Sequence, residues 1–343
     1  MFKQFGGKIK AEHIAKYKKS PQWNGKIFEN LETTTMDIGL KNMPKLIKYS
    51  FTGRATRGPQ ANIPIPSFNQ DSFYQSEPTF VWYGHAVLLL RIGGKNLLID
   101  PMFGPDASPI GPIRTPRFSK DSLSVIDQLP EIDAVLMTHD HYDHLDLASF
   151  QKYHPKVDRY FVALGVERHL EKWGVPASHI QSFDWWDTFS FEGLTLTFTP
   201  SRHFAGRGAF DRAKSFWGGW VIQSNSHQVY WSGDGGYGGH FKEVGERFEK
   251  FDIGFMECGQ YNPMWHQIHM YPEEAVQAAQ DSNVKKIVPV HWGGFTLALH
   301  HWTDPIERFV NAAKSNNFDF NTPEIGAVFG ISDSLKEEWW RRY

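Results

Sequence analysis

This sequence of 343 residues has one cysteine, no long apolar run and a net charge close to zero. The single cysteine, Cys258, excludes an intramolecular disulfide and a thiolate metal cluster, so we expect it to be a small buried apolar side chain. The longest uninterrupted aliphatic run, 86–90, is far shorter than the roughly 20 residues of a membrane-spanning helix. Because the first residues also lack the apolar stretch of a secretory signal, the expected location is the cytoplasm.

The net charge of −2 hides an uneven distribution along the chain. Residues 1–60 contain 12 Lys and Arg residues against four Asp and Glu residues, whereas the rest of the chain contains 24 against 34. The overall balance does not favour a nucleic-acid partner. Seven lysines fall within the first 26 residues. This basic arm either contacts anionic lipid head groups, which would give peripheral membrane association, or is a solvated surface.

The character of the sequence changes near residue 76. Residues 1–75 are basic, then rich in proline, glycine and asparagine, without a long periodic apolar pattern, which predicts an N-terminal extension. Residues 76–343 are expected to form one domain, because 41% of the chain is apolar and supports a large core. Strands are predicted at 80–83, 86–92, 97–99, 132–137, 194–198, 228–231 and 286–290, and helices at 145–153, 164–173 and 273–281. This clustering predicts an α/β fold with two packed sheets flanked by helices.

A dense group of histidines and aspartates directly follows the predicted strand at 132–137. Its six residues contain three imidazoles and two carboxylates. Residues two apart in an extended loop point the same way, so His139 and His141 can share one cation. Asp143 and His144, entering the following helix, would face the opposite side and suit a second cation. Imidazole and carboxylate without thiolate match zinc and also tolerate manganese or iron. The alternative, a loop of solvated histidines, is disfavoured by the density of the group.

Three further polar residues stand where other predicted strands end. They are His203, Asp234 and His291. Each alone is more typical of an ordinary loop residue, but side chains at strand ends are held by a rigid sheet and often form sites. Their shared context therefore favours metal ligation.

Residues 233–238 also match the glycine pattern of dinucleotide-binding proteins. That interpretation requires a helix opening on the glycines, in a βαβ unit near the start of a domain. Here Gly239 delays any helix and the motif lies late in the chain. We therefore favour glycines that let the backbone approach a metal cluster closely.

The order of these residues is similar to the dinuclear metal signature of the metallo-β-lactamase superfamily, and the resemblance implies its αββα sandwich. Five segments more narrowly resemble the phospholipases D that hydrolyse N-acyl-phosphatidylethanolamine, together with their bacterial relatives. They lie at residues 82–86, 210–212, 217–220, 272–275 and 291–293. Residues 257–262 depart from the corresponding segment of the mammalian phospholipase.

The resemblance implies a role for each candidate ligand. One divalent ion would be held by His139, His141 and His203, a second by Asp143, His144 and His291, and Asp234 would bridge the two. Zinc is the expected metal, with manganese or iron as alternatives. The iron-dependent redox branch of the superfamily typically has Glu in place of the second histidine, so the resemblance favours hydrolysis over electron transfer.

The chemistry that follows is hydrolysis. Two cations bridged by a carboxylate and a water lower the pKa of that water toward neutrality, which makes hydroxide available without a protein base. The resemblance implies a phosphodiesterase of the phospholipase D type, in residues 76–343, that acts on N-acyl-phosphatidylethanolamine or a related amphiphile. One alternative is a hydrolase of lactones, thioesters or other carbonyl compounds on the same metals. Another is a binding protein without catalysis, which the complete ligand set disfavours.

Six other residues are candidates for supporting roles. His269 precedes a Pro-Glu-Glu helix, as a histidine does in the phospholipase, and would position the substrate or protonate the leaving group. Asp100 and His85 would orient metal ligands. The alternatives are a packing histidine at 269, a turn cap at 100 and a core histidine at 85. Aromatic walls of a substrate pocket, or else core filling, are expected from Trp217, Trp265 and Trp292.

Overall fold

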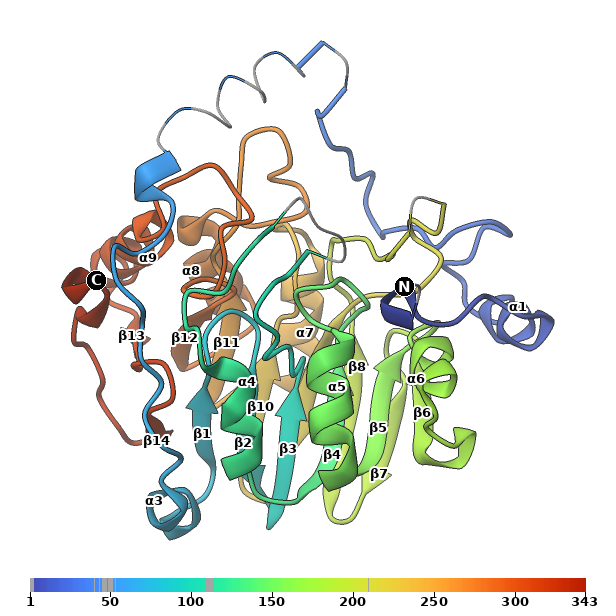
Figure 1. Ribbon diagram of the computed structural model, residues 1–343, viewed down its shortest axis with the longest axis horizontal. Coiled ribbons are helices and arrows are strands. Elements are labelled where there is room, and N and C mark those ends of the chain that lie inside the picture. Colours follow the sequence, from blue (N-terminus) through green and yellow to red (C-terminus); the bar gives the residue numbers. More distant parts are fainter. Residues whose placement is uncertain are drawn as a thin grey trace.

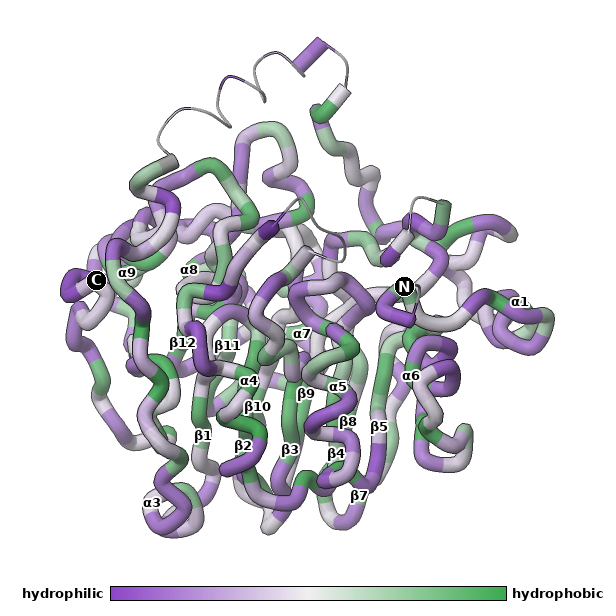
Figure 2. The backbone as a smooth tube through the Cα atoms, viewed as in Figure 1, coloured by the Kyte–Doolittle hydropathy of each residue, from purple (hydrophilic) through white to green (hydrophobic). Residues whose placement is uncertain are grey.

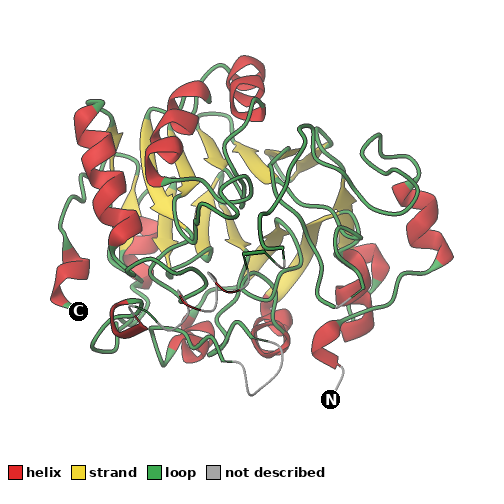
Figure 3. Ribbon diagram, turned by 90° about the horizontal axis from the view of Figure 1, so that it is seen from above, coloured by secondary structure: helices red, strands yellow, loops and turns green. Residues whose placement is uncertain are grey.

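The computed structural model describes residues 3–39, 41–42, 44, 48, 52, 54–108, 114–208 and 210–343. Within these residues, two seven-stranded sheets pack face to face, and helices cover their outer faces (Figures 1 and 3). This arrangement confirms the predicted αββα sandwich. The strand order is β14-β1-β2-β3-β4-β5-β6 in the first sheet and β13-β12-β11-β10-β9-β8-β7 in the second.

The elements have the following bounds. The first sheet contains β1 (Thr79–Trp82), β2 (Leu88–Ile92), β3 (Lys95–Ile99), β4 (Ile132–Met137), β5 (Val157–Ala163), β6 (Ile180–Phe183) and β14 (Val328–Gly330). The second contains β7 (Thr188–Phe191), β8 (Leu194–Thr199), β9 (Gly219–Gln223), β10 (Gln228–Trp231), β11 (Ile253–Glu257), β12 (Lys286–Val290) and β13 (Asp319–Phe320). The helices are α1 (Ala11–Tyr17), α3 (Gln70–Gln75), α4 (Ser122–Val125), α5 (Leu147–Tyr153), α6 (Glu167–Trp173), α7 (His240–Phe248), α8 (Pro272–Asp281) and α9 (Asp304–Ser315). Short 3-10 turns occur at Lys3–Phe5, Arg54–Thr56, Ile126–Gln128, His154–Lys156, Ala177–His179 and Trp339–Arg342.

Strand direction brings the polar strand ends to one edge of the sandwich. In the first sheet β1 and β3 are both antiparallel to β2, and β4 is parallel to β3. In the second sheet β8 and β10 are both antiparallel to β9, while β11 and β12 continue parallel to β10. The loops that follow β1, β3, β4, β8, β10, β11 and β12 therefore lie together, at the top of the sandwich in Figure 1. We call this side the carboxyl edge.

The core lies between the sheets and under the helices. Central strands are buried on both faces, so β2 and β4 are nearly continuous apolar runs instead of alternating ones. Figure 2 shows hydrophobic residues concentrated along the strands. Aromatic rings join the two sheets, since the rings of Phe80 in β1 and Phe255 in β11 have centroids 5.2 Å apart. Cys258 is fully buried, as predicted.

The predicted elements are present, with shifts that local chemistry explains. The helix predicted from residue 145 begins at Leu147, because the Asp146 side chain accepts the Ser149 amide and caps it. The helix predicted from residue 164 begins at Glu167, because Gly165 takes a φ of +91° that only a turn accommodates. Strands β5, β6, β7, β9, β11, β13 and β14 escaped prediction. Edge strands such as β7 are largely exposed and lack an apolar run.

The N-terminal residues pack against the domain. Tyr17 and Phe28 are buried in the same apolar core as the strands, and so is Phe73 of α3. The blue trace of residues 20–39 rises along the carboxyl edge (Figure 1). The division at residue 75 remains a prediction. Among the described residues, no helix has the length and hydrophobicity that crossing a membrane requires.

Candidate metal centre

The structure brings all seven predicted ligands together at the carboxyl edge. Four of them follow β4, and one each follows β8, β10 and β12. The first group consists of His139, His141 and His203, and the second of Asp143, His144 and His291 together with His85. Asp234 lies within reach of both groups.

The first group is a cluster of three rings. The Nδ1 atom of His141 lies 2.9 Å from Nε2 of His139 and 3.2 Å from Nε2 of His203. His203 Nδ1 donates to the Ile268 carbonyl at 2.9 Å, so its Nε2 lone pair faces the cluster. Burial lowers the pKa of His139 and His203 well below the usual value and that of His141 to about 4. The three rings are therefore neutral and offer lone pairs.

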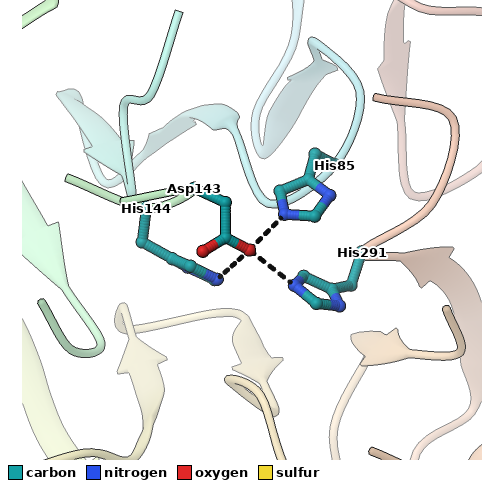
Figure 4. A group of neighbouring side chains, drawn as sticks. All are labelled: His85, Asp143, His144 and His291. Atoms are coloured by element: carbon teal, nitrogen blue, oxygen red, sulfur yellow. Dashed lines mark hydrogen bonds and ion pairs between the residues drawn. The ribbon is translucent and has the colours of Figure 1, made fainter. Parts of the chain in front are cut away.

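The second group surrounds the carboxylate of Asp143. Its Oδ2 atom lies 2.8 Å from His85 Nε2, 3.4 Å from His291 Nε2 and 3.5 Å from His144 Nε2 (Figure 4). On the far side of its ring, His144 Nδ1 donates to Asp100 at 2.9 Å. His85 follows β1 of the first sheet and His291 follows β12 of the second, so both sheets contribute to this group.

The carboxylate of Asp234 stands between the two groups. Its Oδ2 atom lies 2.9 Å from Nε2 of both His144 and His291 in the second group. In the first group, the corresponding distances are 3.9 Å to His139 Nε2 and 4.0 Å to His203 Nε2. Burial opposes ionisation, but the charges of His144 and His291 outweigh it and hold the pKa of Asp234 well below its usual range.

This donor set fits two divalent cations. Two atoms bound at 2.0–2.1 Å to a tetrahedral zinc are about 3.3 Å apart, close to the separations of the converging nitrogen and carboxylate atoms. Buried imidazoles and carboxylates this close together, without a thiolate, form a site able to bind metal ions. Zinc as the metal and the individual ligand roles remain predictions.

Asp100 holds residues 138–145, which we call the metal-binding loop, to the strand β4 that precedes them. It is fully buried and accepts from the Thr138 amide at 2.8 Å and the Thr138 hydroxyl at 2.6 Å, while it also contacts His144. Because the Thr138 hydroxyl donates to Asp100, its oxygen accepts from His139 Nδ1 at 2.9 Å, which leaves His139 Nε2 facing the cluster. Asp100 thus orients one ring from each group.

Three residues of the site have a strained backbone. His85, Asp100 and His291 have positive φ values of 54°, 41° and 65°. Such conformations are costly for side-chain-bearing residues and persist only where the surroundings impose them. The His291 amide donates to the His85 carbonyl at 2.9 Å, so two of these strained residues hold each other.

Sequence reasoning missed one buried acid of the site, Glu257. It ends β11, and its Oε1 lies 2.5 Å from His269 Nδ1, while its Oε2 accepts the Gly235 amide. His269 stacks on His291, with ring centroids 5.2 Å apart. Residues 253–256 form an apolar run before this acid, as in the other strands that end in site residues. This pattern could have predicted both the strand and Glu257 as a site residue.

The tryptophans occupy different surroundings. Trp217 is buried beside the site and donates to Asn30 Oδ1 at 3.0 Å. Trp265 is half-buried and donates to the Gln260 carbonyl. Trp292 is buried in the aromatic core, with its ring centroid 5.4 Å from that of Trp82 and 5.3 Å from that of Trp339.

Other atoms of the chain occupy the space around the glycine motif at residues 233–238. A Cβ atom on Gly236 would lie 2.1 Å from the Gln267 carbonyl oxygen, and one on Gly233 would lie 2.1 Å from that of Gly218. Helix α7 begins only at residue 240. This packing supports close backbone approach and leaves no phosphate cradle at these glycines.

A cavity of about 500 Å³ opens beside the first group of histidines. One side is formed by N-terminal residues 27–34 and Met36. The other side includes His203, Phe204, Arg212, Trp217 and Ile268. The N-terminal residues therefore line the space next to the metal centre, a contribution that the sequence did not predict.

Comparison with known proteins agrees with this geometry. Residues 95–292 match the family model described as β-lactamase superfamily domain. An uncharacterized Mycobacterium tuberculosis protein is 34% identical over 94% of this chain and 88% of its own length. The N-acyl-phosphatidylethanolamine-hydrolyzing phospholipase D 1 of Caenorhabditis elegans is 26% identical over 91% of this chain and 95% of its own.

Solved structures share the fold at low sequence identity. The isothiocyanate hydrolase from Delia radicum gut bacteria superposes with a TM-score of 0.57 at 20% identity, over 74% of this chain and 98% of that one. The metallo hydrolase Igni18 of Ignicoccus hospitalis superposes with a TM-score of 0.55 at 18% identity, over 74% and 97%. The chain belongs to the metallo-β-lactamase superfamily of metal-dependent hydrolases.

Proposed function

We propose that the protein is a dinuclear metal phosphodiesterase of the phospholipase D type that hydrolyses N-acyl-phosphatidylethanolamine or a related anionic amphiphile. The observation that carries this proposal is the buried Asp234 carboxylate between two groups of converging ligands. A carboxylate that bridges two cations would hold them close enough together to bind the same phosphodiester group. The similarity to the phospholipase of Caenorhabditis elegans, over nearly the whole of both chains, supports the choice of substrate class.

The chain's own residues supply positioning and proton transfer. Two bound cations would acidify a water and neutralise charge on phosphoryl oxygens. Ring nitrogens of His269 and His203 and a carboxylate oxygen of Asp234 lie within 4.8 Å of one another. Glu257 accepts from His269 Nδ1, which sets the ring orientation and leaves Nε2 available to the substrate. When the ring carries a proton on both nitrogens, His269 is thus placed to donate the Nε2 proton to a leaving oxygen.

The cavity beside His203 suits an amphiphile. Ile27, Leu31, Met36 and Phe204 supply apolar surface along it. The Arg212 guanidinium lies over the Phe204 ring at 3.6 Å and adds a positive charge to the same cavity. An apolar chain and an anionic head group would both find matching surface there.

The experiment that tests this function compares substrate classes on one metal-loaded preparation. We expect turnover of bis-(p-nitrophenyl) phosphate and of N-acyl-phosphatidylethanolamine in mixed micelles, loss of turnover on chelation, and recovery with zinc or manganese. Turnover of lactones or thioesters alone would replace this proposal with the carbonyl hydrolase. Less than one metal ion per chain after reconstitution, with no turnover, would indicate a binding protein.

Arg212→Ala is expected to raise KM for the micellar phospholipid about tenfold with little change in kcat. The physical reason is that a hydrogen bond to a charged group contributes roughly 1.5–3 kcal/mol. Turnover of bis-(p-nitrophenyl) phosphate, which has no apolar chain or second head group, should stay close to wild type. Arg247→Ala is the matched control, because Arg247 pairs with Glu243 on the surface of α7. An unchanged KM would exclude Arg212 from substrate binding.

We also propose that the lysines of the basic arm and two exposed apolar side chains touch anionic membranes. Leu31 and Phe210 are 54% and 90% exposed, and the seven lysines of the basic arm are exposed as well. Apolar side chains beside cations are the usual composition of a peripheral membrane contact.

Vesicle sedimentation measures this contact. Binding to phosphatidylserine-containing vesicles is expected to fall with added salt, and a Leu31→Ala/Phe210→Ala double variant should bind several-fold more weakly. Phe189→Ala serves as control, since Phe189 is 39% exposed on the edge strand β7. Equal binding by the double variant, or none at low salt, would reject the contact.

A further inference from the structure

The first described residues of the chain contact helix α6. The Lys3 carbonyl accepts from Trp173 Nε1 at 2.8 Å. The Gly7 amide donates to His169 Nδ1 at 3.2 Å, and the Gly7 carbonyl accepts from Arg168 Nε at 3.2 Å. These contacts join residues more than 160 positions apart, and we call residues 3–7 the N-terminal clamp.

Two glycines make this close approach feasible. Gly6 has a φ of +75°, and a Cβ atom there would lie 1.9 Å from His169 Nδ1. A Cβ atom on Gly7 would lie 1.9 Å from the backbone carbonyl oxygen of Arg168. Only glycine allows the backbone to reach α6 at both positions, because a side chain would collide with fixed atoms.

Helix α6, which the N-terminal clamp contacts, also contacts the metal-binding loop. His169 Nε2 lies 2.9 Å from Oδ2 of Asp140, the residue between His139 and His141. Since His169 Nδ1 accepts from Gly7, its proton is on Nε2, which donates to Asp140. The Gly206 amide donates to the other oxygen of Asp140 at 2.7 Å. Asp140 is fully buried and cannot turn toward solvent.

Arg207 makes a second connection between the N-terminal clamp and the metal-binding loop. Its Nη1 donates to the Asp140 carbonyl at 2.7 Å and to the Leu145 carbonyl at 2.6 Å, so it holds both ends of the metal-binding loop. Its Nη2 donates to the Gln4 carbonyl at 2.7 Å. The N-terminal clamp therefore reaches the loop by two separate routes.

We propose that the N-terminal clamp, acting through His169 and Arg207 on Asp140, positions the metal-binding loop and raises the affinity of the first histidine group for its metal ion. Ligands whose neighbours hold them in place bind metal more tightly than ligands free to reorient. His169, Arg207 and Asp140 are positioning residues, since they act through His139 and His141. This inference rests on the metal site of the proposed function and is independent of the substrate.

The decisive experiment compares full-length Gly7→Ala with Gly39→Ala, which changes a glycine with open space around it on the same N-terminal stretch. Zinc affinity is measured by competition with a chromophoric chelator, and folding by circular dichroism and thermal unfolding. Gly7→Ala is expected to bind one of its two zinc ions about 10- to 100-fold less tightly than wild type while remaining folded. Gly39→Ala should match wild type.

A second pair of variants keeps the test decisive if Gly7→Ala does not fold. His169→Leu removes both hydrogen bonds and should lose zinc affinity, whereas His169→Gln can still accept from Gly7 and donate to Asp140 and should recover most of it. Wild-type zinc affinity in folded Gly7→Ala or His169→Leu would overturn the inference alone. A wild-type protein that binds no zinc would overturn it together with the proposed function.

Discussion

Asp234→Asn is expected to lower turnover about 10²- to 10⁴-fold while the protein stays folded. The substitution keeps the size of the side chain but removes a negative charge that faces His144 and His291 at 2.9 Å. Breaking a buried charge pair costs about 3–5 kcal/mol, which corresponds to that loss of rate if the two cations depend on the bridge. Steady-state kinetics with zinc restored, together with metal content per chain, measures the effect.

Asp252→Asn is the matched control for this substitution. Asp252 pairs with Lys285 at 3.0 Å and caps the Gln228 amide, away from the metal centre. It is also the acid that a dinucleotide site would need after the glycine motif, so near-wild-type activity of this variant would count against that interpretation as well. Unchanged turnover in purified Asp234→Asn would show that the metal centre has been assigned wrongly.

His269→Ala is expected to lower kcat about 10²- to 10⁴-fold for a phosphodiester with an alcohol leaving group. An alkoxide needs a proton as it departs, and the His269 ring is held by Glu257 beside the candidate ligands. The loss should be much smaller for bis-(p-nitrophenyl) phosphate, because p-nitrophenolate leaves without protonation. Comparing kcat for the two substrates measures the proton transfer separately from binding.

The neighbouring His266 provides the control, since it is exposed and contacts only Pro263 and Tyr271 among the interactions described for it. His266→Ala should leave both substrates unaffected. Equal losses for both substrates in His269→Ala would assign His269 to substrate positioning, and no loss would leave it a packing histidine. Glu257→Gln should show a weaker form of the same leaving-group dependence, because the amide still accepts a hydrogen bond.

The αββα architecture and the place of the metal centre were predictable because both depend on local patterns. A buried strand such as β4 is a continuous apolar run, and the polar residues after it are necessarily at its carboxyl end. Glu257 escaped because β11 itself was not recognised, although its apolar run has the same form. When a strand is not predicted, the site residue that follows it is therefore not predicted either.

The N-terminal contribution was beyond the reach of sequence patterns. Gly7 and His169 meet only because the whole sandwich has folded, and nothing near either residue in the sequence indicates the other. The surroundings of the tryptophans were likewise not predictable from the neighbouring sequence. Trp217 lines the cavity and Trp292 packs in the core, yet both stand directly beside glycine or histidine residues of recognisable motifs. Which way such a ring points is decided by tertiary packing.

Because the candidate ligands follow strands of both sheets, the metal centre can be complete only after most of the chain has been synthesised. A growing chain exposes His139 and His141 on the first sheet long before it has produced His203 or His291 on the second. Among the described residues, β14 is the strand furthest along the chain, and it pairs with β1 at the edge of the first sheet. A ribosome-bound chain that stops before residue 291 would therefore lack one of the candidate ligands and hold an incomplete site.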